Sequence, residues 1–317
     1  MAEYDCYNDT HPEPAGSIMK HVCIAVPVII LIFLCLSSTP INSQAADRKL
    51  LIGLIPEMNI FKQKQRFKPL GEYLSKKTGT KIGFTIVSRY ENIIENFGKE
   101  KMDGAFLGSF TGYAGIHKLG LMPIARPVNL DNTSEYQGYI FVRRDGHIRD
   151  VKDMKGKKMA FVDKATTAGY VFPLAYFKEH GVASYEHFLK EYYFAGSHDA
   201  AIEAVLNGKA DIGAAKHSIY NRVRKENPRI DRELVILARS PWVPENGLCV
   251  RKNLDDIIVK KLKDALLNMH NDAEGRNILK EFQAIKFIAA TAKDYEPVHE
   301  LAAKAGIKIK EYNWHNK

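Results

Sequence analysis

A strand, a short turn and a helix start follow one another between residues 161 and 177. Phe161 and Val162 end an apolar run that predicts a strand, and apolar residues return at helical spacing from Val171 to Phe177. The turn between them carries two threonines (Thr166, Thr167). A helix that starts after a strand directs free backbone N–H groups and the positive end of its dipole beyond the strand. The stretch therefore predicts an α/β unit whose turn can bind an anion.

The same design occurs a second time, in the first half of the chain. Gly108-Ser109-Phe110-Thr111-Gly112-Tyr113 follows an apolar run and precedes a segment with helical spacing. Thr166 or Thr167 could serve only as an N-cap that satisfies its own helix. The repetition favours anion binding, with Thr166 and Thr167 as the main side-chain donors of the second half.

The N-terminal residues predict export. An uncharged apolar run extends from Val22 to Leu36 after Lys20 and His21, and Ser43-Gln44-Ala45 resembles a small-x-small cleavage site. Fifteen residues are short for a membrane span. Residues 1–46 are therefore interpreted as an N-terminal extension with a signal peptide, and a retained membrane anchor is the alternative.

Cysteine usage and charge restrict the possible sites and partners. Three of the four cysteines lie before residue 46, and only Cys249 follows, which excludes an internal disulfide and a cysteine-rich metal site in the exported part. The full chain has a net charge of +9. Its basic residues are scattered, without interleaved aromatics or a nucleic-acid motif, so we expect a solvated basic surface and no nucleic-acid partner.

Strands and helices alternate along the chain, which predicts an α/β fold with mainly parallel sheets. The predicted strands are 49–55, 81–87, 102–107, 121–126, 136–144, 158–162, 192–195, 210–215 and 234–238. The predicted helices are 67–78, 90–99, 111–119, the helix after Thr166, 198–206, 219–226, 254–269, 273–282 and 295–305.

This order suggests two α/β lobes. Residues 47–138 form the first lobe, residues 139–238 form the second as an insertion, and residues 239–317 return to the first lobe and add the C-terminal helices. Two crossings would then form a hinge. Because ligands of open α/β sheets bind beyond the carboxyl ends of the strands, both helix starts could face one cleft between the lobes.

Catalytic chemistry is not indicated. The sequence contains no Gly-x-Ser-x-Gly, no phosphate-binding Walker loop and no His-Glu-x-x-His helix, and its histidines show no metal-ligand spacing. We therefore expect no catalytic residue, no metal and no cofactor, and an enzyme on this fold would rest on analogy alone.

Seven short segments resemble, in order and spacing, the substrate-binding proteins of phosphonate, phosphite and phosphate ABC transporters. They are 88–94, 102–111, 136–139, 166–169, 196–200, 208–214 and 240–244. The resemblance covers about 48–290. It implies a periplasmic protein with a type II periplasmic-binding-protein fold that closes on a tetrahedral oxyanion and delivers it to a permease. Delivery to a membrane sensor kinase is the alternative, which the neighbouring genes would distinguish. We expect a monomer.

The resemblance also implies site residues. Tyrosines matching Tyr90 and Tyr136 line the cleft in that family, the turn matching Thr166, Thr167 and Ala168 holds the phosphonyl oxygens, and a histidine matching His198 reaches the same group. Two positions depart from the pattern: Ala168 replaces a frequent serine, and Lys216 stands where relatives often carry aspartate. The candidate ligand-binding set is Tyr90, Ser109, Phe110, Thr111, Tyr136, Thr166, Thr167, Ala168, His198 and Lys216.

Lys216 predicts a preference among ligands. It follows the predicted strand 210–215, so it can point into the cleft or be a solvated lysine at a helix start. In the cleft, it would add a positive charge that repels the ammonium group of an aminoalkylphosphonate. The expected ligand is therefore a simple oxyanion.

Overall fold

The computed structural model describes residues 49–316. The predicted signal peptide within residues 1–46 and the alternative membrane anchor lie outside them. Among the described residues, no helix is long and apolar enough to span a membrane.

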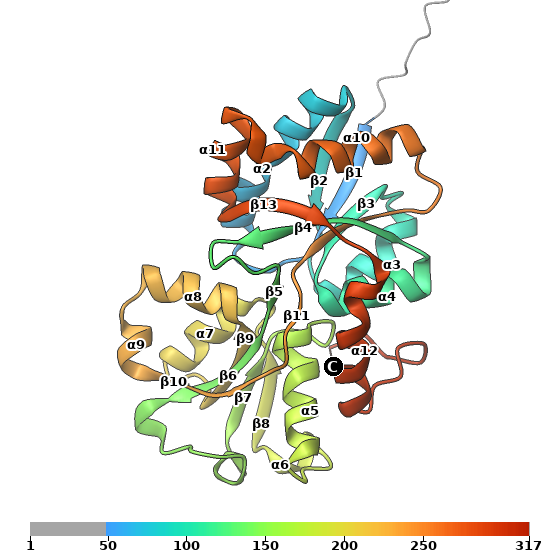
Figure 1. Cartoon of the computed structure of the whole chain (residues 1–317). Coiled ribbons are helices and arrows are strands. Elements are labelled where there is room, and N and C mark those ends of the chain that lie inside the picture. The colour runs from blue at the N-terminus through green and yellow to red at the C-terminus, as the bar shows by residue number, and fades with distance from the viewer. Residues whose placement is uncertain (1–48, 317) are drawn as a thin grey trace, which may run out of the picture. The chain divides into compact units, whose positions relative to one another are not determined.

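Lobe 1 carries a six-stranded sheet. Its strands, in spatial order, are β13 (Ala284–Ala289), β4 (Met122–Asn129), β12 (Gly247–Val250), β3 (Gly104–Leu107), β1 (Lys49–Leu54) and β2 (Lys81–Ile86). Its helices are α2 (Ile60–Thr78), α3 (Tyr90–Lys99), α4 (Ser109–Leu119), α10 (Asp256–Leu267) and α11 (Ala273–Phe282). Figure 1 shows these elements in the upper half of the molecule.

Lobe 2 carries a five-stranded sheet. The strand order is β10 (Leu234–Arg239), β6 (Gly138–Arg143), β9 (Ile212–Lys216), β7 (Lys158–Phe161) and β8 (Glu191–Phe194). Its helices are a π-helical turn η3 (Thr167–Val171), α5 (Phe172–Glu179), α6 (Tyr185–Phe188), α7 (His198–Leu206), α8 (His217–Glu226) and α9 (Arg229–Glu233). This lobe forms the lower half in Figure 1.

Two crossings join the lobes. The outgoing strand β5 (Glu135–Tyr136) pairs in antiparallel fashion with the returning strand β11 (Val243–Pro244). Ser240 ties the crossings further: its Oγ accepts the N–H of Gly138 at 2.8 Å, and its carbonyl accepts the side-chain amide of Gln137 at 2.8 Å. The paired crossings form the hinge region.

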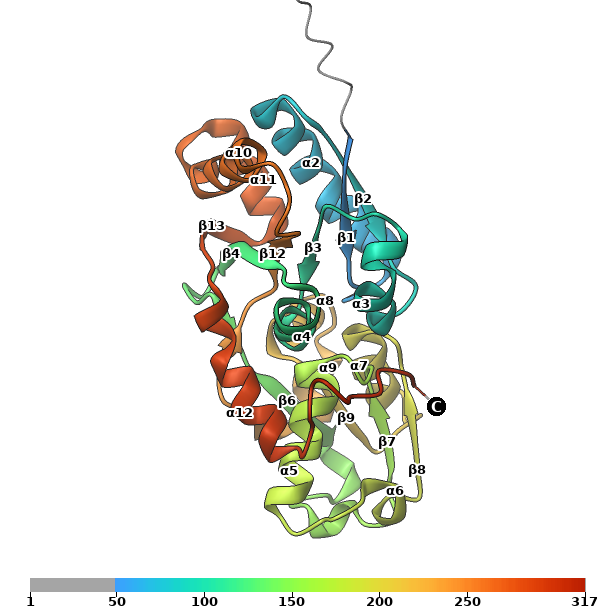
Figure 2. The ribbon, with the colours of Figure 1, turned by 90° about the vertical axis from the view of Figure 1, so that its right-hand side faces the viewer.

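The C-terminal helix joins both lobes. The sequence assigned it to lobe 1, but α12 (Glu296–Lys304) packs against α4 of lobe 1 and against α5 and η3 of lobe 2. Figure 2 shows α12 extending from lobe 1 towards α5, with the remaining tail crossing beside the lower lobe.

The α/β class and its two sheets confirm the predicted fold class, but the prediction of mainly parallel sheets is wrong. Strands β1, β2 and β3 are parallel, as are β7, β8 and β9. The strands that run opposite to these are β12 and β13 in lobe 1 and β6 in lobe 2, and β4 and β10 pair with them in antiparallel fashion. The sequence prediction missed β12 and β13, which return from the hinge and complete the sheet of lobe 1.

Helix α2 begins at Ile60, earlier than the apolar pattern predicts. Asn59 caps it by accepting the N–H groups of Phe61 and Lys62. Phe61 is 76% exposed, so the first turn carries no apolar periodicity that a sequence pattern could detect.

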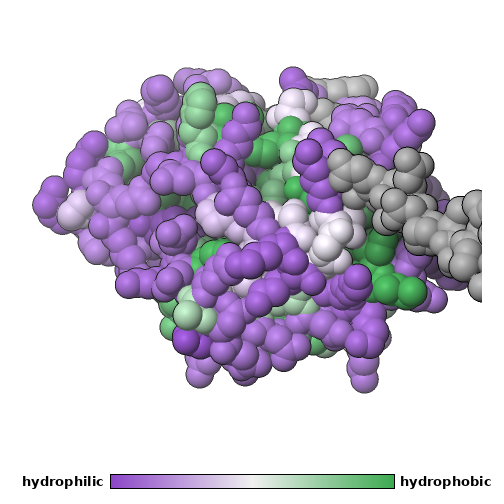
Figure 3. Space-filling model, turned by 90° about the horizontal axis from the view of Figure 1, so that it is seen from above, coloured by the Kyte–Doolittle hydropathy of each residue, from purple (hydrophilic) through white to green (hydrophobic). Residues whose placement is uncertain are grey.

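Large apolar side chains are exposed singly rather than in a continuous patch. The most exposed are Phe61, Ile257 and Leu130, which lie on separate elements or loops. The face seen in Figure 3 is mostly hydrophilic, with scattered apolar areas. Such isolated side chains are normal on a protein surface.

Candidate ligand-binding site

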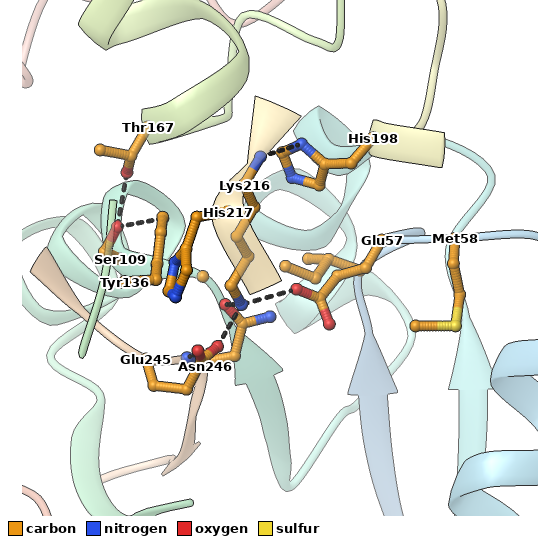
Figure 4. Close-up of polar contacts among 12 residues, drawn as sticks. Glu57, Met58, Ser109, Tyr136, Thr167, His198, Lys216, His217, Glu245 and Asn246 are labelled. Carbon is orange, nitrogen blue, oxygen red and sulfur yellow. Dashed lines mark hydrogen bonds and ion pairs between the residues drawn. The ribbon is translucent and has the colours of Figure 1, made fainter. Parts of the chain in front are cut away.

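The two predicted helix starts meet. Ser109 is the first residue of α4 in lobe 1, and Thr167 is the first residue of η3 in lobe 2. Their hydroxyl oxygens, Oγ and Oγ1, are 2.6 Å apart. Figure 4 shows Ser109 between Thr167 and Tyr136. The repeated strand–turn–helix design therefore places both turns at one point between the lobes.

Both helix starts leave backbone donors available. Their N-cap residues are Gly108 and Thr166, and neither makes a side-chain capping hydrogen bond among the residues described. Gly169 lets η3 approach the end of β7 closely, because a Cβ there would lie 2.4 Å from Cβ of Val162, the residue after β7. An uncapped helix start with free N–H groups suits a bound anion.

The threonine hydroxyls at the two helix starts have different hydrogen-bond partners. Thr166 donates its hydroxyl to the carbonyl of Asp163 at 2.6 Å, and Thr111 donates to the carbonyl of Gly108 at 3.2 Å. These protons serve the local turns. The expectation that Thr166 is a main side-chain donor is therefore wrong for this conformation, and Thr167 is the donor candidate of lobe 2.

Three hydroxyl groups form a chain in which one proton is left over. Ser109 Oγ lies 2.6 Å from both Tyr136 Oη and Thr167 Oγ1. Each hydroxyl has one proton to donate, so two hydrogen bonds among three hydroxyls leave one proton for another acceptor. Burial raises the pKa of Tyr136, which keeps its phenol protonated.

Tyr90 provides a second unused donor. Its hydroxyl is buried and has no hydrogen-bond partner within the part of the chain that the structure describes. Burial and the nearby carboxylate of Glu57 raise the pKa of Tyr90 well above its ordinary value. A protonated hydroxyl that is buried without an acceptor is unfavourable unless a ligand accepts from it.

Lys216 ends β9 and is buried in a cage of acceptors. Its Nζ donates to Glu57 Oε1 at 3.0 Å, to Asn246 Oδ1 at 3.0 Å and to Glu245, and it lies 4.5 Å from the ring centre of Tyr136 (Figure 4). A lysine ammonium has three donors, and these three bonds use all of them. Lys216 therefore reaches the cleft, as predicted, but has no N–H left for a ligand in this conformation.

The carboxylates keep this cluster ionised. Burial would lower the pKa of Lys216, but Glu245 and Glu57 raise it above its ordinary value. Burial would likewise raise the pKa of Glu57, but Lys216 and Arg66 lower it to about 2. The positive charge that the sequence predicts for Lys216 in the cleft is present, but two carboxylates pair with it and compensate it.

His198 begins α7 and connects the lobes. Its backbone N–H donates to the carbonyl of Glu57 at 3.3 Å, and its Nδ1 accepts the N–H of Lys216 at 3.2 Å. Burial lowers the pKa of His198 to about 4. The neutral ring therefore carries its proton on Nε2, which makes Nε2 a hydrogen-bond donor.

The pocket between the lobes contains nine of the ten predicted ligand-binding residues. Its lining is Ile55, Glu57, Tyr90, Gly108, Ser109, Phe110, Thr111, Tyr136, Ala165, Thr166, Thr167, His198, Lys216 and Asn246. Ala168 is the exception, because it packs beneath the turn against Gly138 of β6. The cavity volume is about 10 Å³, close to what one water molecule needs, so a tetrahedral oxyanion requires the walls to separate.

Glu57, Glu245 and Asn246 also belong to the site but were not predicted from the sequence. Glu57 could have been found, because it follows the carboxyl end of the first predicted strand, as Ser109 follows the third. Glu245 and Asn246 lie just after the proline-rich hinge segment, where no local pattern indicates that they meet Lys216. Among the described residues, no group of three or more His, Cys, Asp or Glu is placed to hold a metal ion.

We expect His198 to make stability depend on pH. Its folded pKa of about 4 lies below the ordinary 6.5, so the unfolded chain binds the extra proton between these values. The free energy of unfolding should therefore fall by about 3 kcal/mol as pH is lowered through this window, at about 1.36 kcal/mol for each pH unit. Urea unfolding of wild type and His198→Gln at several pH values measures it, and an equal slope in both proteins would contradict it.

Comparison with known proteins identifies the family. The family model for the periplasmic phosphonate substrate-binding proteins of ABC transporters matches residues 52–295. The chain belongs to this family. It is thus a periplasmic substrate-binding protein of an ABC transporter rather than an enzyme, and the resemblance found in the sequence is confirmed.

Similar proteins carry related names. A phosphate-import protein of Mycolicibacterium smegmatis is 31% identical over 77% of this chain and 80% of its own length. A probable ABC transporter phosphite-binding protein of Prochlorococcus marinus is 25% identical over 90% of this chain and 97% of its own. The phosphonates-binding periplasmic protein of Escherichia coli is 22% identical over 83% of this chain and 79% of its own.

Solved structures confirm the fold. The binding-protein component of a phosphonate ABC transporter from Pseudomonas aeruginosa has a TM-score of 0.76 at 23% identity, covering 82% of this chain and 87% of its own. The Prochlorococcus marinus protein in complex with methylphosphonate has a TM-score of 0.72 at 23% identity, covering 82% of this chain and 99% of its own. This likeness supports the type II periplasmic-binding-protein fold.

Proposed function

We propose that the protein binds one small oxyanion of the phosphonate, phosphite or phosphate type between its lobes and presents it to an ABC permease. The meeting of Ser109 and Thr167, each at an uncapped helix start, carries this proposal. Backbone N–H groups and hydroxyls there can hold a tetrahedral anion without a full ionic partner. The relatives named for phosphite and phosphate support the same ligand class.

The proposal includes export by a signal peptide within residues 1–46 and action as a monomer. It also includes closure of the two lobes over the ligand, since donors from both lobes reach one point only when the lobes are together. Bonds across the cleft support a closed state. The N–H of Asn59 donates to Asp199 at 2.9 Å, Lys62 pairs with Glu226 at 2.7 Å, and Glu57 pairs with Lys216.

Lys216 supports a simple oxyanion over an aminoalkylphosphonate, for a reason that differs from simple charge repulsion. Its own ammonium occupies the position between Glu57, Glu245 and Asn246, over the face of Tyr136. A ligand ammonium would need these same acceptors. Because the protein already fills the cage, an aminophosphonate would bury its ammonium without partners.

We predict a ranking of ligands by thermal shift. Phosphate, phosphite or methylphosphonate should stabilise the wild type more than 2-aminoethylphosphonate does, because stabilisation follows the ratio of ligand concentration to Kd. In Lys216→Ala the acceptors Glu57, Glu245 and Asn246 become free. The thermal shift with 2-aminoethylphosphonate should therefore increase relative to the shift with methylphosphonate. Measurement at equal concentrations tests both. The strongest stabilisation of wild type by 2-aminoethylphosphonate would overturn the ligand choice, and no shift with any of the four would overturn the oxyanion site.

A further inference from the structure

The C-terminal tail (Ile307–Asn316) lies beyond residues 52–295, which match the family model, and yet contacts both anion-binding turns. We propose that this tail is a positioning strap: it holds the turn of lobe 2 and the helix start of lobe 1 in the register that ligand binding needs. The inference rests on the proposed function, because it concerns the same site. Figure 2 shows the tail crossing from the end of α12 to the C-terminus.

The strap fixes the turn of lobe 2 through hydrogen bonds. Asn316 accepts the N–H of Lys164 at 3.0 Å with Oδ1 and donates from Nδ2 to Asp163 Oδ2 at 2.8 Å. Tyr312 donates its hydroxyl to the carbonyl of Lys164 at 2.9 Å. Asp163 in turn accepts the N–H of Ala165 and, through its carbonyl, the hydroxyl of Thr166. The tail thereby holds the residues that lead directly into Thr167.

The strap fixes the helix start of lobe 1 through aromatic packing. The ring of Trp314 lies 5.1 Å from that of Phe110, and the ring of Tyr312 lies 5.4 Å from it. Phe110 is fully buried and is the second residue of α4, next to Ser109. Lys118, near the end of α4, places its ammonium 5.3 Å from the ring of Trp314. The aromatic residues of the tail therefore pack on the neighbour of Ser109, and its hydrogen bonds hold residues that lead into Thr167.

This arrangement predicts an effect on binding that exceeds the effect on folding. The tail adds Trp314 to the core and packs Ile307, Ile309 and Tyr312 against it, but it contains no strand, so its loss should leave both sheets intact. Without it, the two turns would have to be ordered when ligand binds, which reduces affinity by the cost of that ordering. Losing the two hydrogen bonds of Asn316 should weaken binding by about tenfold.

The test is calorimetric titration with inorganic phosphate and with methylphosphonate. Full-length wild type is compared with Asn316→Ala, Trp314→Ala and a chain that ends at Lys310. Lys310→Ala is the matched control, because Lys310 is an exposed residue of the same tail. We expect Asn316→Ala to bind about tenfold more weakly, the shortened chain to bind more weakly still, and Lys310→Ala to bind as wild type does.

A second readout separates positioning from general stability. The chain has two tryptophans, so Trp242→Phe leaves Trp314 as the only indole reporter on the strap. Its emission should change when phosphate is added. Suppose that wild type binds either oxyanion, the tail variants bind it with an affinity within twofold of wild type, and the emission is unchanged. The positioning role of the strap is then overturned, and the proposed function stands. If wild type binds neither oxyanion, the proposed function fails, and the strap fails with it.

Discussion

Replacement of Lys216 by methionine is expected to destabilise the folded protein by about 3–5 kcal/mol. The change removes the ammonium that pairs with Glu57 and Glu245, both of which are buried. The side chain keeps its length, so packing is largely preserved and the unpaired carboxylates account for the loss. Urea unfolding of the ligand-free protein measures the change in the free energy of unfolding.

Lys260→Met is the matched control for this prediction. Lys260 pairs with Asp264 on the surface of α10 at 2.7 Å, with its side chain 78% exposed. Exposed pairs on a helix are worth only about 0.3–0.5 kcal/mol. A Lys216→Met protein as stable as the Lys260→Met protein would mean that the buried cluster does not hold the charges described above.

Removing the Tyr90 hydroxyl is expected to weaken oxyanion binding by about ten- to a hundredfold. A hydrogen bond to a charged group is worth about 1.5–3 kcal/mol, which corresponds to that range of affinity. The folded, ligand-free protein should not lose stability in Tyr90→Phe, because the hydroxyl has no partner among the described residues and its burial is already unfavourable. Calorimetry and urea unfolding measure the two quantities.

Tyr136→Phe provides the contrast. The Tyr136 hydroxyl bonds to Ser109 Oγ, so its removal should reduce the stability of the ligand-free protein by about 0.5–1.5 kcal/mol as well as weaken binding. The two tyrosines line the same pocket and differ in whether their hydroxyls are already bonded. A stability loss in Tyr90→Phe equal to that in Tyr136→Phe would show that Tyr90 has a structural partner.

The sequence alone predicts the structure around a residue where that structure depends on the residue's immediate neighbours. The bounds of α3 and α7, 90–99 and 198–206, agree with the prediction, because apolar periodicity and the flanking turns define them locally. The same holds for the helix start at Thr167, whereas α4 begins at Ser109, before the predicted start at residue 111. Each start lies beyond the carboxyl end of a strand in its own sheet, β3 or β7, where ligands of open α/β sheets bind.

The rest of the site depends on contacts between distant segments. Lys216 meets a residue 159 positions away and two that lie 29 and 30 positions away, and no local pattern pairs them. Strand β12 is buried along its whole length and β13 shows no regular alternation of burial, so neither carries the alternation that would mark it. The tail is predicted as neither helix nor strand, and its contacts with Asp163 and Phe110 could not be inferred from spacing alone.

Calorimetric titration of wild type and Tyr90→Phe with inorganic phosphate, beside unfolding of both ligand-free proteins, tests most directly whether unpaired buried donors form an oxyanion site. We expect phosphate to bind wild type at one site per chain, Tyr90→Phe to bind about ten- to a hundredfold more weakly, and both ligand-free proteins to be equally stable or Tyr90→Phe more so. Equal affinity of the two proteins for phosphate, phosphite and methylphosphonate alike would contradict the site described above.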